Sequence, residues 1–171
     1  MDEGGLRALI ERDPYNPHHW TEVVRVAENS GNYSAVVRAY EGFLSRFPLM
    51  HIYWDKWAKV VHAQTRSIDD ALEIYQRALL PGVLQYSVEM WQLFLEFVKG
   101  TETPPERKRS FFETAINTVG QVFNSDAIWT LYLGWEESEG NIGNVSRLFA
   151  RILSTPIKGL ENAWQNFTEH I

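Results

Sequence analysis

Cysteine is absent from this chain of 171 residues, which excludes disulfide bonds and thiolate metal sites. No apolar run approaches the roughly 18 residues that a membrane-spanning helix needs. The sequence starts Met-Asp-Glu-Gly-Gly, which lacks the apolar core of a secretory signal. The sequence therefore predicts neither a membrane-spanning nor a secreted protein, and the lack of cysteine is compatible with a reducing compartment.

Positive charge is scarce, because 16 Lys and Arg stand against 22 Asp and Glu, for a net charge of −6. This balance argues against broad binding to a phosphate backbone. The one dense basic cluster is Arg107, Lys108 and Arg109. It is either the solvated start of a helix or a contact for an acidic partner or for RNA phosphates. We keep the three residues as candidate partner contacts.

Signatures of catalysis, cofactor binding and metal binding are also missing. His18 and His19 are adjacent, so on a helix they point about 100° apart and cannot chelate a metal as an i, i+4 pair would. The chain has no Gly-rich phosphate loop and no Gly-x-Ser-x-Gly motif. We predict a protein that is not an enzyme, with no catalytic residues, no cofactor and no metal.

Glu136, within the acidic stretch Glu136 to Glu139, is the carboxylate most open to a catalytic interpretation. Its spacing from Trp129 and Tyr132 instead places it on an apolar helix surface. A buried carboxylate without a partner would be costly. We therefore expect Glu136 to pair with Arg147 or Arg151 of the following helix.

Aromatic residues are abundant, with 7 Trp, 7 Tyr and 9 Phe, and they follow helical spacing. In the segment 142–153 the apolar residues recur at i, i+3, i+4, i+7 and i+8, which is typical of a one-sided amphipathic helix. The preceding segment, 128–135, is apolar over roughly 200° of a helix surface. One neighbour cannot cover that arc, whereas stacked helical repeats can.

Tryptophan marks the repeat. Five tryptophans recur at intervals of 34, 37, 38 and 35 residues: Trp20, Trp54, Trp91, Trp129 and Trp164. The first four are each followed, about 20 residues later, by a second aromatic residue: Tyr40, Tyr75, Phe112 and Phe149. A period in this range indicates two-helix repeats. We expect all five tryptophans to be buried between successive hairpins.

Breaks at Gly, Pro and Asn residues delimit the helices. We predict a short helical segment at 6–12, then helices at 17–29, 33–46, 51–64, 68–80, 88–99, 104–119, 126–139 and 142–153 and one from about 160, with no sheet. Asn16, Ser87 and Ser125 are expected N-caps, and Thr103 with Glu106 fits a capping box. The fold class is all-α, an α-solenoid of antiparallel helix pairs with about four and a half repeats. We predict one array over 1–171, with repeats at about 16–48, 50–82, 87–120 and 125–156 and a partial one at 160–171.

The fourth repeat has the most informative residue pattern. Trp129-x-x-Tyr132-x-x-Trp135-Glu136 leads to Gly140-Asn141, and the second helix carries Phe149 and Arg151 before a closing Pro156. This pattern resembles the HAT (half-a-tetratricopeptide) repeat. In the other repeats Ala27, Val61 and Val98 replace Glu136, and Lys108 replaces the apolar Val36, Ala71 and Val145.

The resemblance implies a function, because HAT repeats occur almost wholly in eukaryotic RNA-processing assemblies. Further stretches, Tyr40 to Pro48 and Tyr53 to Ala58, are most similar to a HAT splicing factor associated with the U1 small nuclear ribonucleoprotein (snRNP). This resemblance implies a nuclear, non-catalytic scaffold that binds snRNP proteins and aids 5′ splice-site recognition. Homo- or heterodimerisation would use repeats beyond this chain, and direct RNA contact stays open. The alternatives are a HAT subunit of another complex, of the crooked-neck or cleavage-stimulation type, or a tetratricopeptide-like adaptor that clamps a peptide.

Overall fold

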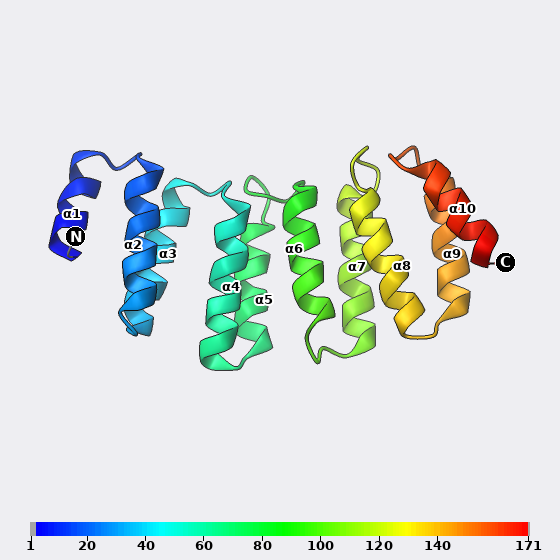
Figure 1. Cartoon of the computed structure of the whole chain (residues 1–171), viewed down its shortest axis with the longest axis horizontal. Helices are drawn as coiled ribbons and strands as arrows, with labels where there is room; N and C mark the ends of the chain where they lie inside the picture. The colour runs from blue at the N-terminus through cyan, green and yellow to red at the C-terminus, as the bar shows by residue number, and fades with distance from the viewer. Residues whose placement is uncertain (1–2, 171) are drawn as a thin grey trace. The chain divides into compact units, whose positions relative to one another are not determined.

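A computed structural model describes residues 3–170, and every regular element in that range is a helix (Figure 1). Residues 1, 2 and 171, which the predicted array included, lie outside the described residues, as do the side chains of Glu3, Leu6, Arg7 and His170. The helices are α1 (Glu3–Arg12), α2 (Pro17–Asn29), α3 (Tyr33–Arg46), α4 (His51–Thr65), α5 (Ile68–Ala78), α6 (Val88–Lys99), α7 (Pro105–Val119), α8 (Asp126–Ser138), α9 (Ile142–Leu153) and α10 (Leu160–His170).

Local capping chemistry sets several helix starts. The side chain of Asn16 accepts a hydrogen bond from the backbone N–H of His18, and that of Ser87 accepts one from Met90, which confirms these two predicted N-caps. Ser125 stands at the cap position of α8, but its hydroxyl makes no capping hydrogen bond and instead donates to the Gly120 carbonyl at 2.8 Å. The capping box at Thr103 is wrong, because α7 begins one residue later than expected, with Pro104 at the cap position. The Thr103 hydroxyl instead lies 2.8 Å from that of Thr101.

The helices form two compact units, an N-terminal unit of α1–α5 and a C-terminal unit of α6–α10. In the N-terminal unit the hairpins α2/α3 and α4/α5 meet where α3 contacts α4, and α1 packs on α2. In the C-terminal unit α8 contacts both helices of the hairpin α6/α7, and α9 contacts α8 and α10. Each unit is thus built from helix pairs that pack on the next pair, as the α-solenoid prediction requires. A single continuous array over both units stays a prediction.

The repeating tryptophans are the shared feature of the hairpins. The first four are buried, with exposed fractions of 8%, 6%, 5% and 3% for Trp20, Trp54, Trp91 and Trp129. In the first three the indole N–H donates to the carbonyl oxygen six residues earlier, at 2.8–2.9 Å: Pro14, Pro48 and Gln85. Trp129 donates to the Gly120 carbonyl at 2.9 Å. Each indole therefore joins the start of a hairpin to the connection that precedes it.

Trp164 departs from this pattern. It is 56% exposed, so the prediction that all five tryptophans are buried is wrong at this position. The reason is local: its helix, α10, packs on α9, and among the described residues no further helix covers the opposite side of α10. Trp164 contacts Phe167 of its own helix at 5.9 Å between ring centroids, and Phe167 in turn reaches Phe149.

Candidate functional site

The basic cluster lies in the first turns of α7, and its three side chains have three different environments. Arg107 is exposed, with its guanidinium 5.7 Å from the centre of the Phe111 ring. Lys108 is buried, and its ammonium donates to the backbone carbonyl of Lys99 at 3.0 Å. That carbonyl belongs to the C-terminal end of α6, where the helix dipole favours a cation. All three residues of the cluster are candidate partner contacts by sequence, but among them only Arg107 is exposed.

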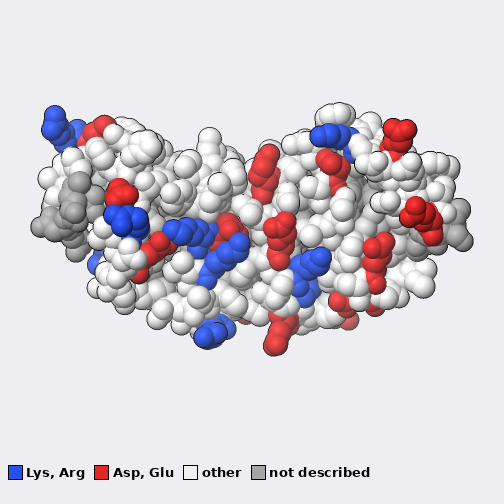
Figure 2. Space-filling model, viewed as in Figure 1, with Lys and Arg blue, Asp and Glu red and all other residues white. Residues whose placement is uncertain are grey.

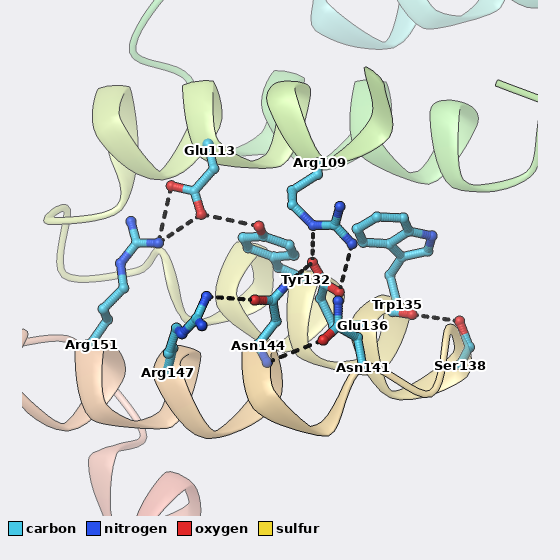
Figure 3. A network of polar contacts seen from close by, with 10 residues as sticks. All are labelled: Arg109, Glu113, Tyr132, Trp135, Glu136, Ser138, Asn141, Asn144, Arg147 and Arg151. Carbon is cyan, nitrogen blue, oxygen red and sulfur yellow. Dashed lines mark hydrogen bonds and ion pairs between the residues drawn. The ribbon is translucent and has the colours of Figure 1, made fainter. Parts of the chain in front are cut away.

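Arg109, the third member, points toward α8 and binds Glu136 at two points (Figure 3). Its Nε donates to Oε1 at 2.6 Å and its Nη2 donates to Oε2 at 3.1 Å. The amide Nδ2 of Asn144 donates to Oε1 at 3.3 Å. The Glu136 side chain is completely buried, so these donors take the place of solvent. The hydrogen bond to Glu136 raises the pKa of the Arg109 guanidinium, which keeps it charged.

The expectation that Glu136 is buried with an arginine partner is confirmed, but the expected partner is wrong. Neither Arg147 nor Arg151 contacts Glu136: Arg147 donates to the Asn144 amide oxygen at 3.1 Å, and Arg151 binds Glu113. Glu136 lies on the side of α8 that faces the preceding hairpin. Its charge is therefore neutralised across the junction of two hairpins rather than inside its own.

Glu113 of α7 is a second polar centre of the same junction (Figure 3). It accepts from the Tyr132 hydroxyl at 3.0 Å and from Arg151 at 2.7 and 3.0 Å. The guanidinium of Arg151 also lies 5.4 Å from the ring centre of Trp129. Glu113 thus links α7 to both α8 and α9. Burial and the neighbouring Glu113 carboxylate raise the pKa of the Tyr132 phenol, so Tyr132 stays a hydrogen-bond donor.

Aromatic rings fill the space between the two polar centres. Phe112 stacks on Tyr132, with ring centroids 4.7 Å apart, and on Trp135, at 5.3 Å. Arg109 lies 5.3 Å from the Trp135 ring centre. Such cation–π and stacking contacts are each worth about 0.5–2 kcal/mol. The α7–α8–α9 junction therefore combines ion pairs with close-packed rings.

This geometry is suited to mechanical support rather than to chemistry at Glu136. Both of its carboxylate oxygens are engaged by fixed donors, and no part of the side chain is open to solvent. A general base needs hydrogen-bond reach to a substrate proton, which this arrangement does not offer. Ala27, Val61 and Val98 occupy the equivalent buried positions of the other hairpins. Among the described hairpins, a buried carboxylate at this position is thus specific to α8.

Neither a metal site nor a membrane-spanning helix is present within residues 3–170. No group of three or more His, Asp or Glu side chains is arranged to hold a metal ion in this part of the chain. None of the described helices combines the length and the apolar character needed to cross a bilayer.

Comparison with known proteins decides the family. A family model described as "PRP39 N-terminal HAT repeat" matches residues 5–169. The chain belongs to this family. The HAT resemblance and the α-solenoid class expected from the sequence are confirmed, and the splicing factor to which the chain is similar is pre-mRNA-processing factor 39.

Individual relatives agree with this assignment. The chain is 29% identical to pre-mRNA-processing factor 39 of Xenopus laevis over 167 residues, which is 95% of this chain and 26% of the relative. It is also 29% identical to the Homo sapiens protein of that name, over 95% of this chain and 24% of the relative. The mRNA 3′-end-processing protein rna14 of Schizosaccharomyces pombe is 25% identical, over 96% of this chain and 24% of the relative. The chain therefore spans about a quarter of the length of these relatives.

Proposed function

We propose that this chain is a non-catalytic scaffold segment in pre-mRNA splicing, within a nuclear factor associated with the U1 snRNP that aids 5′ splice-site recognition. The observation that carries the proposal is the family match over residues 5–169. It is supported by the relatives named pre-mRNA-processing factor 39, each matched over most of this chain.

The physical basis of the scaffold is the way hairpins are held at fixed angles. Between α7 and α8 the Arg109–Glu136 pair and the Tyr132–Glu113 hydrogen bond define one relative orientation. A buried pair with two matched hydrogen bonds tolerates little sliding, since a shift of either helix would leave a charge buried without its partner. A rigid surface of this kind holds partner proteins in a constant relation.

The partners of the proposal are snRNP proteins, with homo- or heterodimerisation through repeats beyond this chain. The exposed Arg107 is the member of the basic cluster that can reach an acidic protein or an RNA phosphate. Lys108 and Arg109 support it indirectly, because their internal contacts fix the start of α7.

Affinity purification of the full-length protein from nuclear extract tests the assignment. We expect U1 small nuclear RNA and snRNP proteins among the bound species. Two differently tagged copies in the same cells test the dimer. Recovery of cleavage and polyadenylation factors without U1 RNA would replace the proposal with its alternative, a subunit of the 3′-end-processing machinery. The similarity to rna14 favours that second candidate.

A further inference from the structure

A groove of about 500 Å³ lies in the C-terminal unit, lined by α8, α9 and α10. Figure 1 shows α8 and α10 in front of α9, and α9 contacts both of them. Part of the lining is apolar: Trp129 and Leu133 come from α8, and Phe149 and Ile152 from α9. This volume falls within the range of about 300–1,000 Å³ that is usual for ligand pockets.

Gly134 stands in the middle of α8 and lines this groove. Glycine destabilises a helix interior relative to alanine, so it needs a reason there. Internal packing does not supply one, because a Cβ built on Gly134 meets no atom within 4 Å. At Gly42, by contrast, a Cβ would come within 2.6 Å of the Trp20 ring. At Gly134 the missing side chain leaves space inside the groove, which suits the close approach of a bound chain.

Three acidic residues are among those that line the groove. Asp126 begins α8, Glu137 stands near its end, and Glu169 stands near the end of α10. None of these three carboxylates forms an ion pair or side-chain hydrogen bond with another residue in the described range, whereas Glu113 and Glu136 are both satisfied internally. Figure 2 shows acidic side chains outnumbering basic ones on this face of the C-terminal unit.

A single basic residue, Lys158, is found among the residues that line the groove. The field of the groove is therefore negative, and it attracts a cationic occupant. Asp126 and Glu137 are 11 positions apart, which corresponds to about 16 Å along a helix. An extended peptide covers that distance with about five residues.

Two amide side chains, Asn162 and Asn166, lie one turn apart on α10 and also line the groove. An amide offers both donors and an acceptor, the complement of an extended peptide backbone. The groove lining thus combines amides from α10, apolar side chains from α8 and α9, and carboxylates from α8 and α10.

We propose that the α8–α10 groove binds a short, extended, basic segment of a partner protein. Lys or Arg side chains of the segment face Glu137 and Glu169, and an apolar side chain enters the space beside Gly134. The backbone lies against Asn162 and Asn166. This inference rests on the proposed scaffold function, for which it names the chemical class of one partner.

Peptide selection on the intact chain tests the proposal. A random 12-residue library displayed on phage is selected on the wild-type chain, and the recovered sequences are synthesised and measured by fluorescence anisotropy. We expect enrichment of peptides that combine Lys or Arg with apolar residues. Their affinity falls at least about tenfold for Gly134→Leu and for the double variant Glu137→Lys/Glu169→Lys.

Two controls separate groove filling from misfolding. Leucine favours the helix more than glycine does, and Gly134 has open space around it, so the Gly134→Leu chain unfolds at a temperature no lower than wild type. Gly143→Leu is the matched control, because a Cβ at Gly143 on α9 also meets no atom within 4 Å but lies outside the groove lining. Its peptide affinity stays at the wild-type value.

The proposal is overturned if no peptide is enriched, if the enriched peptides lack basic residues, or if Gly134→Leu binds them as wild type does. If peptide binding fails while U1 RNA still co-purifies with the full-length protein, the groove inference is wrong and the scaffold function stands. If peptides bind but U1 RNA does not co-purify, the groove stands and the splicing assignment fails.

Discussion

Arg109 of α7 and Glu136 of α8 form a two-point ion pair, at 2.6 and 3.1 Å, across the junction of two successive hairpins. In the other hairpins, the residues equivalent to Arg109 are Val37, Leu72 and Ser146. Those equivalent to Glu136 are Ala27, Val61 and Val98. The two charges thus replace mostly apolar residues at one junction. A pair of this kind favours one packing arrangement, although it adds less net stability than its number of contacts suggests.

The pair makes a prediction about unfolding. Glu136→Ala leaves Arg109 partly buried without its carboxylate, and we expect the free energy of unfolding to fall by about 3–5 kcal/mol in urea denaturation. Replacing both partners, as Arg109→Met with Glu136→Leu, should recover most of that loss. A single variant within about 1 kcal/mol of wild type would mean that the pair does not hold the junction.

The tryptophans give a second, independent test of the repeat. Trp91→Ala and Trp129→Ala should each cost about 3–5 kcal/mol, the range for a buried tryptophan. Trp164→Ala is the matched control, and because Trp164 is 56% exposed we expect a loss below about 1 kcal/mol. Equal losses at all three positions in chemical denaturation would contradict the burial pattern.

Much of this organisation could be predicted from the sequence. The regular Trp spacing and the capping residues determine the hairpins, so most predicted helix ends agree with the structure within two residues. The sequence also contains a pattern that corresponds to the indole contacts. Pro14 and Pro48 both stand six residues before a repeating Trp, and their carbonyls accept a hydrogen bond from its indole N–H.

The candidate site was less accessible to sequence reasoning. Glu136 and Lys108 interrupt an apolar register, and this signal identified them correctly as unusual. Their partners depend on how α7 packs on α6 and α8, which residue spacing within one hairpin does not encode. Arg109 therefore looked like a surface charge beside Arg107, although only Arg107 is exposed.

Alkaline pH should weaken the fold through two tyrosines. Burial, with the neighbouring Glu28 and Glu113 carboxylates, raises the pKa of the Tyr40 and Tyr132 phenols well above the ordinary value of 10.0. Below pH 10 both the folded and unfolded chains keep these protons. Above it the unfolded chain loses them first, so the free energy of unfolding falls as pH rises.

The measurement compares variants from about pH 9 to about pH 11. Tyr40→Phe and Tyr132→Phe should each lose stability less steeply with pH than the wild-type chain does. Tyr86→Phe, at a residue that is 70% exposed, should follow the wild-type slope. Identical slopes in all four proteins would show that neither buried phenol is linked to folding.

Arg107 allows a clean test of the surface contact. Arg107→Ala should leave stability within about 0.5 kcal/mol of wild type, since the side chain is exposed. If Arg107 contacts RNA, the logarithm of the RNA-binding constant should fall less steeply with the logarithm of the salt concentration in the variant. The magnitude of that slope should be smaller by about 0.7–0.9. Arg38→Ala, an exposed arginine on α3, serves as the control. Unchanged affinity and slope would remove Arg107 as a contact for RNA.

Recovery of U1 small nuclear RNA tests the central claim most directly. The full-length protein and a variant that lacks the segment corresponding to residues 5–169 are each purified from cells. The U1 RNA bound to each is quantified per mole of protein. We expect removal of the segment to lower U1 RNA recovery at least about tenfold, the loss expected when several central contacts of an interface are deleted. Equal recovery from both proteins would contradict the account, because the hairpins would then not hold the particle.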